Sequence, residues 1–481
     1  MNIKILIASA ALLLTVSCTG TTAPQTQGGT APADRPAACE RFGPNTRPPA
    51  EETPTTIDVV EQAYFCILAE YYGGATLDTR PLLVGGFAAL TDELGRGGRD
   101  VAEATMPALT GDRQADWAAF ETVYRRITDR LPEDAKLRER LAAVTLEAVV
   151  AELRDNHARW SYGGQRPPDY HDGDLYDLGL KASVSIPQVS NRPGTALPPL
   201  FVATVLGGAA KAAGLRPGDV IESVGGAAPF VGGRVTPAAV AALHPRYPQA
   251  DPVRIGLLRP GTGRRWTVTL KPGLYQPDPA AVQRVTSKPL PGGLAYVRLS
   301  GFAPDAATRV LEAITALGTG RRLTGVVLDL RGNGGGSPAE VNRLLGGFAH
   351  GKVTAYHCTA DGACDTERTD DGVTLLNLPL AVLTDRGCAS ACEHFSAAVK
   401  DLGLGRLVGT RTAGAISGPA QPYLLSNGTV LGFPAKRHLG PGRELIDRIG
   451  VAPDHHVPLT AEDAAAGRDP ALAKAQTLLR G

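Results

Sequence analysis

Ser390 is the residue whose sequence surroundings best suit covalent chemistry. A short apolar run at 380–383 predicts a buried strand before it, a turn follows at 385–387, and an apolar stripe predicts a helix over 391–402. A serine at such a strand-to-helix elbow can project its hydroxyl, while the first backbone N–H groups of the helix can stabilise an oxyanion. Acyl transfer requires this arrangement. A serine that only caps the helix would show the same pattern.

The glycine run at 334–336 could serve the same chemistry, because glycine lets a backbone N–H approach a substrate carbonyl closely. The run fits a tight strand-to-helix turn equally well. A serine hydroxyl also needs a base, and the lysines near it in sequence are Lys400, on the predicted helix, and Lys436, at a basic strand end. Neither suits the buried lysine of a Ser–Lys dyad, so another base is needed if the serine is a nucleophile.

The elements that must position these groups fall into successive regions. Helical periodicity dominates residues 55–162, short β-like runs separated by glycine turns occupy residues 170–275, and strands alternate with helices over residues 290–458. Residues 459–481 form a further helical segment. The predicted fold class is therefore a multidomain α+β or α/β protein with a helical N-terminal domain and a layered α/β core.

The first residues have the layout of a secretory signal peptide. Residues 1–18 combine a short positive start with an apolar run, 5–16, that is too short to span a bilayer. Cys18 directly after a small residue resembles a bacterial lipobox and predicts a lipid anchor, with ordinary signal cleavage as the alternative. Residues 19–54 are poor in large apolar residues and predict a flexible tether. We therefore expect an exported protein held at the membrane surface of the cell envelope, on its periplasmic or extracellular face.

The composition excludes one large class of partners. The chain has 481 residues, and 49 Lys and Arg stand against 48 Asp and Glu, so it is nearly neutral and no nucleic-acid partner is expected. A hydrophobic content of 43% is ample for the cores of two or three domains.

Export makes disulfides possible, and the six cysteines after Cys18 fall into near pairs. Six cysteines allow fifteen pairings, and we predict the local ones. For the pair that flanks Ser390, two buried small side chains are an equal alternative to a bridge. No pair has the spacing of a zinc site, and we predict no metal and no cofactor. The pairs are Cys39/Cys66, Cys358/Cys364 and Cys388/Cys392.

Four motifs, in order along the chain, resemble those of the carboxy-terminal processing, or tail-specific, serine peptidases. Residues 209–221 resemble part of a PDZ domain, and residues 328–336 resemble the family's Asp-Leu-Arg-Asn-Asn-x-Gly-Gly stretch. Residues 388–393 resemble the Ser-Ala-Ser-Ala-Ser-Glu nucleophile turn, and residues 446–454 resemble the Ile-Glu-Gly-x-Gly-Val-x-Pro-Asp segment. The resemblance covers most of the chain after residue 55.

This resemblance implies a role for each motif. Ser390 would be the nucleophile, and the backbone N–H groups of Ala391 and Gly335 would form the oxyanion hole. Residues 170–275 would form a PDZ-like module, and residues 290–458 a crotonase-like ββα catalytic core.

The resemblance also decides which base to expect. The lysine-dependent branch of the family has its lysine where this chain has Ala415, whereas the tricorn-like branch uses a histidine before the PDZ domain and a late carboxylate. His157 ends a segment that resembles the Leu-x-Asp-x-His pattern of that branch, and Asp447 stands at the position of the late glutamate. We therefore predict His157, Ser390 and Asp447 as the catalytic residues.

Two departures from the tricorn-like pattern bear on this prediction. Asn156 stands where the tricorn protease has an assisting serine, and Asp447 is one methylene shorter than glutamate. Glu444 is the alternative carboxylate.

The PDZ resemblance implies that Leu178, Gly179 and Leu180 form a loop that binds the terminal carboxylate of a peptide, so polypeptide substrates would be captured through their C-termini or gated. A purely structural module is the alternative. The sequence thus favours an exported serine endopeptidase acting through an acyl-enzyme. Loss of the family lysine also fits a catalytically inactive member that binds peptides or ligands.

Overall fold

The computed structural model groups residues Ala38–Gly481 into one unit. The predicted signal peptide, Cys18 and most of the predicted tether lie outside the described residues. None of the helices in the described part of the chain is long and apolar enough to cross a membrane. The structure describes residues 39–42, 52–161, 167, 169–171, 173–184, 196–245, 247 and 250–480.

The N-terminal region contains four amphipathic helices around an aromatic core. Tyr64 stacks on Trp117, and Trp117 packs against Phe120, with all three rings buried. Asp112 and Asp134 begin two of the helices by accepting backbone N–H groups of their first turns. The helices are α1 (Ile57–Glu70), α2 (Arg80–Arg96), α3 (Arg113–Thr128) and α4 (Ala135–Ala151), with a 3₁₀ turn η1 (Gly74–Thr76) after α1.

A small antiparallel sheet completes this region with strands from both ends of the chain. Its order is β1-β19-β20-β2, and Tyr423 and Phe433 of the late strands are buried in the same core as the helices. Trp160 of β2 lies opposite Leu431 of β20. The helical segment predicted at 55–162 therefore packs on strands from far downstream. The strands are β1 (Glu40–Arg41), β2 (Arg159–Ser161), β19 (Ala420–Leu424) and β20 (Val430–Pro434).

The middle region is rich in short strands and has its own apolar core, as the glycine-separated β-like runs predicted. Its largest sheet has the order β10-β9-β6 and is antiparallel. Its elements are β3 (Leu175–Asp177), β4 (Leu180–Ala182), β5 (Val202–Val205), α5 (Gly208–Ala212), β6 (Val220–Val224), β7 (Phe230–Val231), β8 (Arg234–Val235), α6 (Pro237–Leu243), β9 (Val253–Arg259), β10 (Arg264–Leu270) and β11 (Gly273–Tyr275).

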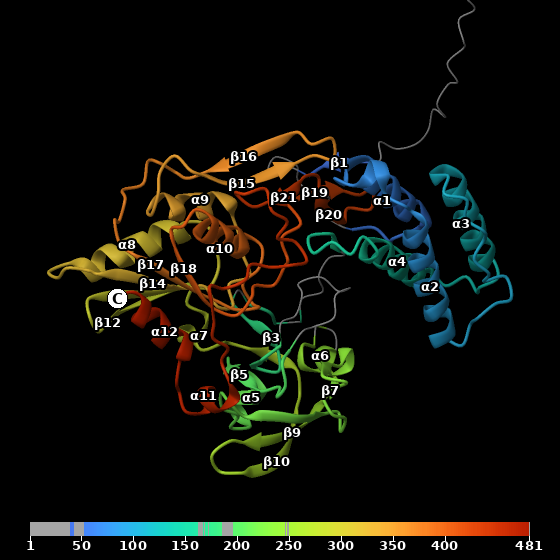
Figure 1. Ribbon diagram of the computed structural model, residues 1–481. Helices are drawn as coiled ribbons and strands as arrows, with labels where there is room; N and C mark the ends of the chain where they lie inside the picture. The colour runs from blue at the N-terminus through green and yellow to red at the C-terminus, as the bar shows by residue number, and fades with distance from the viewer. Residues whose placement is uncertain are drawn as a thin grey trace, which may run out of the picture. The chain divides into compact units, whose positions relative to one another are not determined.

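The third region is built on a six-stranded sheet with the order β12-β13-β14-β17-β18-β22 (Figure 1). The first pair is antiparallel and the others are parallel. The strands are β12 (Val285–Leu290), β13 (Leu294–Leu299), β14 (Gly325–Asp329), β17 (Leu380–Thr384), β18 (Gly405–Gly409) and β22 (His455–His456).

Helices cover both faces of this sheet, which is why β14 and β17 are buried at every position. Val326 and Leu328 of β14 face one layer, whereas Val327 between them faces the other. The first layer is α8 (Ala306–Gly318), α9 (Pro338–Gly346) and α10 (Ala391–Asp401), and the second contains α12 (Pro470–Leu478).

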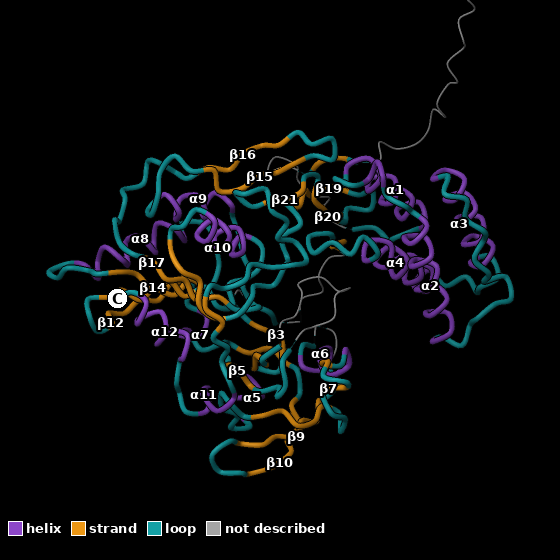
Figure 2. The backbone as a smooth tube through the Cα atoms, in the orientation of Figure 1, coloured by secondary structure: helices purple, strands orange, loops and turns teal. Residues whose placement is uncertain are grey.

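A smaller sheet, β16-β15-β21, lies beside α10, and the tube in Figure 2 shows how loops connect these strands to the central sheet. The whole is a mixed α/β multidomain fold, as predicted. The remaining elements are β15 (Val353–Cys358), β16 (Cys364–Arg368), β21 (Arg437–Leu439), α7 (Pro279–Val282) and α11 (Ala461–Ala465).

The cysteines form the local pairs that their spacing predicted. Cys39–Cys66 fastens the segment around β1 to α1, Cys358–Cys364 closes the β15–β16 hairpin, and Cys388–Cys392 spans the residues on either side of Ser390.

Arg331 connects the end of β14 to the start of α12. Its guanidinium donates to both carboxylate oxygens of Asp329, at 2.9 and 2.6 Å, and to both of Asp469, at 3.0 and 2.7 Å. Asp329 is almost fully buried, and the hydrogen bonds from Arg331 hold the pKa of its carboxyl below the ordinary value despite that burial. Since the 334–336 glycine run begins three residues later, this cluster anchors it.

We expect Arg331→Gln to lower the free energy of unfolding by about 3 kcal/mol, because it leaves a buried carboxylate without its cation. Denaturant unfolding followed by circular dichroism measures the change. Arg343→Gln is the matched control: its partner Asp370 is exposed, so the loss there should stay below about 1 kcal/mol. Equal losses in the two variants would contradict the anchoring role.

Candidate active site

Ser390 lies at a strained elbow directly before α10. Its backbone has a φ of +56°, unusual for a residue with a side chain. The Ser390 N–H lies 3.1 Å from the carbonyl oxygen of Ala415 and 3.3 Å from the carboxylate of Glu393. The residue that packs against this elbow must be a glycine, because a Cβ added to Gly335 would lie 2.7 Å from the Cβ of Ser390. The serine is thus fixed by its own backbone and by the glycine run.

His157 reaches this serine from the other half of the chain. It lies in the turn between α4 and β2, where its backbone N–H donates to Asp155 at 2.8 Å. Its Nε2 lies 3.2 Å from the Ser390 Oγ, although 233 positions separate the two residues. The structure therefore brings together the predicted nucleophile and the predicted base at hydrogen-bond distance.

The other ring nitrogen of His157 contacts a residue that sequence reasoning missed. Its Nδ1 lies 3.0 Å from the Oγ of Ser417, and that Oγ lies 2.6 Å from Oδ1 of Asp155. Tyr71 donates its hydroxyl to the second oxygen of Asp155 at 3.0 Å. Asp155 lies inside the motif that pointed to His157, so the sequence offered a signal for it. Nothing in the sequence around Ser417 marks that serine as a site residue.

Asp447 is not the carboxylate beside the histidine ring, which corrects the predicted pairing. Its Oδ1 accepts from the Asn156 side-chain amide at 2.5 Å and from the backbone N–H of Ile416 at 3.3 Å. The physical reason is that the Asn156 side chain lies between Asp447 and Ser417 and donates to the shorter aspartate side chain. Asn156 in turn accepts the backbone N–H of Ser417 at 3.2 Å. Asp447 is therefore linked to the site through an amide.

Neither side-chain oxygen of Glu444, the alternative carboxylate, has a hydrogen-bond partner among the residues that the structure describes. Burial and the neighbouring carboxyl of Asp401 raise its pKa to about 7.

Burial lowers the pKa of His157 below the ordinary histidine value; the nearby Asp155 carboxylate works in the opposite direction, and Arg159 lowers it further. The imidazole is therefore neutral at neutral pH, which is the state that a general base requires.

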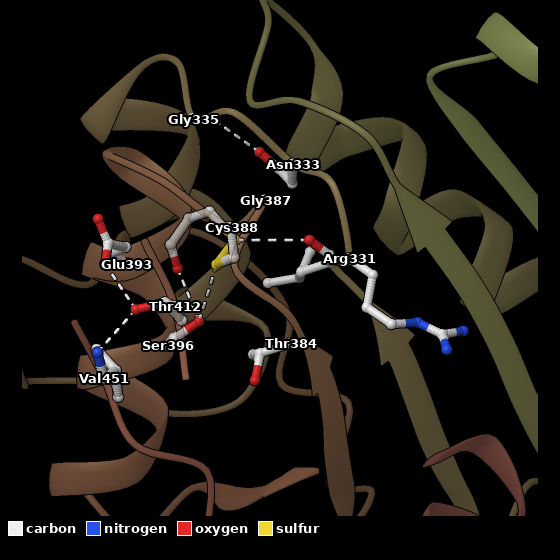
Figure 3. Close-up of a disulfide and its surroundings, with 12 residues drawn as sticks. Arg331, Asn333, Gly335, Thr384, Gly387, Cys388, Glu393, Ser396, Thr412 and Val451 are labelled. Carbon is white, nitrogen blue, oxygen red and sulfur yellow. Dashed lines mark hydrogen bonds between the residues drawn. A yellow bond between two sulfur atoms is a disulfide. The ribbon is translucent and has the colours of Figure 1, made fainter. Parts of the chain in front are cut away.

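The two predicted oxyanion donors differ in their present state. Ala391 is the first residue of α10, so its N–H has no acceptor within the helix. The Gly335 N–H, in contrast, donates to the side-chain oxygen of Asn333 at 2.9 Å, a bond drawn in Figure 3. Asn333 is fully buried and also donates to the carbonyl oxygen of Leu299. The Gly335 N–H can donate to a substrate oxygen only after its hydrogen bond to Asn333 breaks.

Glu393 holds the loop that contains Ala415, the position at which the lysine-dependent branch has its lysine. Its carboxylate accepts the Thr412 hydroxyl and the backbone N–H groups of Gly414 and Ala415, all at 2.6 to 2.7 Å. Thr412 also accepts the N–H of Val451, so the loop, the helix and the 446–454 segment are joined, as Figure 3 shows. Burial raises the pKa of Glu393 to about 7 against these donors.

The residues predicted to bind a peptide carboxylate are turned inward. Leu178 and Leu180 are buried in the core of the middle region. The Gly179 N–H donates to the side chain of Asp177 at 2.6 Å, and the Gly179 carbonyl accepts the N–H of Leu206. A carboxylate thus already lies on the N–H that a terminal carboxylate would use, and peptide binding by this loop stays a prediction.

Within the described part of the chain, no group of three or more His, Cys, Asp or Glu residues has the arrangement needed to hold a metal ion.

Comparisons with known proteins bear on this geometry. Residues 293–457, which include Ser390 and Asp447, match the family model described as "Peptidase family S41". Residues 293–457 of this chain thus match a peptidase S41 domain. The chain is 30% identical over 325 residues to "Carboxyl-terminal-processing peptidase 2, chloroplastic" of Arabidopsis thaliana, a match that covers 66% of this chain and 60% of that one. It is also 30% identical over 152 residues to the "Tricorn protease" of Thermoplasma acidophilum, covering 31% and 13%.

The fold is shared with a solved structure. Mature CPAF superposes with a TM-score of 0.52 at 12% identity, covering 88% of this chain and 96% of the other. The chain spans 60%, 54% and 63% of the lengths of three curated carboxyl-terminal-processing relatives. His157 lies outside the matched S41 segment, so the proposed base comes from a part of the chain that the family model does not describe.

The turn that contains Ser390 carries a disulfide. Cys388 and Cys392 are bonded, and both are fully buried. Ser390 is the middle residue of the short loop that they close. The bridge thus restricts the backbone on both sides of the serine.

We expect the double variant Cys388→Ser, Cys392→Ser to react more slowly with a serine-directed fluorophosphonate, because the elbow loses the covalent restraint on its strained backbone. The rate of labelling at fixed probe concentration measures the effect. The variant Cys358→Ser, Cys364→Ser, which opens the β15–β16 hairpin instead, should label at the wild-type rate. Unchanged labelling of the first variant would mean that packing alone holds the elbow.

Three buried histidines lie behind the nucleophile helix: His357 on β15, His394 on α10 and His438 on β21. His438 Nδ1 lies 3.3 Å from His357 Nε2, and the rings of His394 and His438 have centroids 5.3 Å apart. The Nε2 atoms of His394 and His438 have no hydrogen-bond partner among the described residues. Burial lowers the pKa of His394 to about 3 and that of His438 well below its ordinary value.

This cluster should make the S41 domain sensitive to acid. The unfolded chain binds protons at these histidines near pH 6.5 and the folded chain does not, so the stability that they contribute is complete above that pH and declines as the pH falls below it. Each such histidine costs about 1.4 kcal/mol per pH unit. Denaturant unfolding between pH 7.5 and 5 should show a shallower decline for His394→Leu and an unchanged one for the exposed His456→Gln. A decline as steep as in wild type for His394→Leu would contradict this account.

Proposed function

We propose that this chain is an exported serine endopeptidase that cleaves polypeptides through an acyl-enzyme, with Ser390 as nucleophile and His157 as general base. The observation that carries the proposal is the distance of 3.2 Å between His157 Nε2 and Ser390 Oγ. The match of residues 293–457 to peptidase family S41 supports the reaction class, and the lowered pKa of His157 keeps it neutral, as a general base must be, at neutral pH.

The proposed reaction needs only groups that this chain supplies. His157 Nε2 takes the hydroxyl proton of Ser390 while Oγ attacks the scissile carbonyl carbon. The carbonyl oxygen becomes an oxyanion and accepts the N–H of Ala391 and, after Asn333 releases it, that of Gly335. As the C–N bond breaks, the imidazolium returns the proton to the leaving amine. A water molecule, deprotonated by the same imidazole, then hydrolyses the acyl-enzyme.

The substrates we propose are the C-terminal parts of proteins, because the similar proteins are described as carboxyl-terminal-processing peptidases. We further propose that residues 170–275 form a PDZ-like module that captures or gates these substrates, that residues 290–458 form a crotonase-like core, and that Cys18 carries a lipid anchor. Together these features would place the reaction at the membrane surface of the cell envelope.

A fluorophosphonate probe tests the nucleophile and the base. Wild-type protein should label at Ser390, and Ser390→Ala should not label. The labelling rate of His157→Ala should fall by a factor on the order of 10² or more, because general-base catalysis typically contributes that much. In-gel fluorescence and mass spectrometry of the labelled peptide read the result. His456→Ala, which alters an exposed histidine, is the control and should label at the wild-type rate. Folded wild-type protein that does not label would favour the inactive, peptide-binding alternative.

A further inference from the structure

We infer that Asp155 and Ser417 are the positioning residues of the catalytic histidine, with the Ser417 hydroxyl bridging the Asp155 carboxylate and the His157 ring. This inference rests on the proposed function, in which His157 is the base. It assigns the orienting carboxylate to the front half of the chain, two residues before the histidine, and not to Asp447.

Contact distances at the Ser417 hydroxyl decide where its proton lies. Its Oγ lies 2.6 Å from Asp155 Oδ1, 3.0 Å from His157 Nδ1 and 3.0 Å from Asn156 Oδ1. A hydroxyl has one proton, and an ionised carboxylate only accepts. The shortest contact is the one to the carboxylate, as expected of a charge-assisted bond, so Ser417 donates to Asp155.

The direction of this bond fixes the tautomer of the histidine. With its proton committed to Asp155, Ser417 Oγ can only accept from the His157 ring, so Nδ1 carries the proton. The lone pair is then on Nε2, which lies 3.2 Å from Ser390 Oγ. This is the tautomer that can remove the seryl proton.

The surroundings hold the Asp155 carboxylate in place. Its side chain is 2% exposed, and it accepts three donors: the Ser417 hydroxyl, the backbone N–H of His157 and the Tyr71 hydroxyl. Burial and the Asp155 charge raise the pKa of Tyr71, so this phenol stays protonated and donates. A buried carboxylate with three donors meets the requirement for a stable charge in the interior.

Asp447 acts one step further away. It accepts from Asn156 Nδ2, and Asn156 Oδ1 accepts the backbone N–H of Ser417. This pair holds the serine in place and fixes which way the amide points. The Asp155 charge raises the pKa of His157 and its carboxylate accepts the hydroxyl at the imidazole, whereas Asp447 accepts an amide one residue removed. Removal of the two carboxylates should therefore have different effects on the imidazole.

NMR of protein labelled with carbon-13 at histidine tests this without any need for activity. We expect the pKa of His157 to fall in Asp155→Asn, which removes the charge, and in Ser417→Ala, which removes the acceptor of the Nδ1 proton. A downfield Nδ1–H resonance should be present in wild type and absent in Ser417→Ala. The signal is assigned by its loss in His157→Gln.

The control variant is Asp116→Asn. Asp116 is as buried as Asp155 and accepts the backbone N–H groups of Thr110 and Gly111 in the same helical region, away from His157. It should lower stability and leave the His157 titration unchanged. Ser417→Ala provides an independent test if Asp155→Asn does not fold.

Kinetics provide a second readout. Asp155→Asn can donate an amide N–H to Ser417 Oγ, which turns the hydroxyl proton toward His157 and imposes the wrong tautomer, so fluorophosphonate labelling should slow by on the order of 10²-fold or more. Asp447→Asn should shift the His157 titration less than Asp155→Asn does. A wild-type titration and Nδ1–H signal in Asp155→Asn and Ser417→Ala, or a larger shift in Asp447→Asn, would overturn the inference. Wild-type protein that shows the expected titrations but never labels would refute the proposed peptidase activity. It would not contradict the positioning of His157 by Ser417 and Asp155.

Discussion

The candidate site depends on the pairing of a strand from the front of the chain with a strand from its back. Arg159 to Ser161 in β2 run antiparallel to Val430 to Gly432 in β20, and the Trp160 indole donates to the Thr429 hydroxyl at 2.8 Å. His157 stands two residues before β2, so this register sets its position. A slip of one residue would exchange the faces of β2 and turn the segment that carries the histidine away from Ser390.

The polar groups around the two catalytic candidates form a network of buried carboxylates, each satisfied by several donors. Asp155 orders the histidine turn, Glu393 orders the loop beside the serine, and Asp447 orders the amide between them. Because a buried carboxylate without donors is costly, each of these groups enforces a single backbone arrangement around it. The low polarity of the same interior also depresses the pKa of His157. The rigidity of the site and the neutral state of its imidazole thus have one origin.

The sequence predicted the parts of this site that local patterns carry. The elbow at Ser390 followed from a buried strand and an amphipathic helix, and His157 followed from a motif. The sheet that unites β1, β2, β19 and β20 could not be predicted, because strands of two to five residues leave hardly any periodicity to read. Ser417 lies in a loop that contacts His157, 260 positions upstream, and no local sequence pattern reveals that contact. Which group Asp447 contacts depends on the length of its side chain and on the position of Asn156, and the spacing of residues in the sequence does not reveal either contact.

Asn333 gives the proposed oxyanion hole an internal competitor. Its amide oxygen holds the Gly335 N–H at 2.9 Å, so an arriving peptide carbonyl exchanges one neutral acceptor for another and gains little by doing so. Once the carbon becomes tetrahedral, the oxygen carries a full negative charge and binds the same N–H more strongly than any amide can. In the proposed reaction, the Gly335 N–H would therefore stabilise the oxyanion more than the bound substrate, which would lower the reaction barrier without tightening the hold on intact polypeptide.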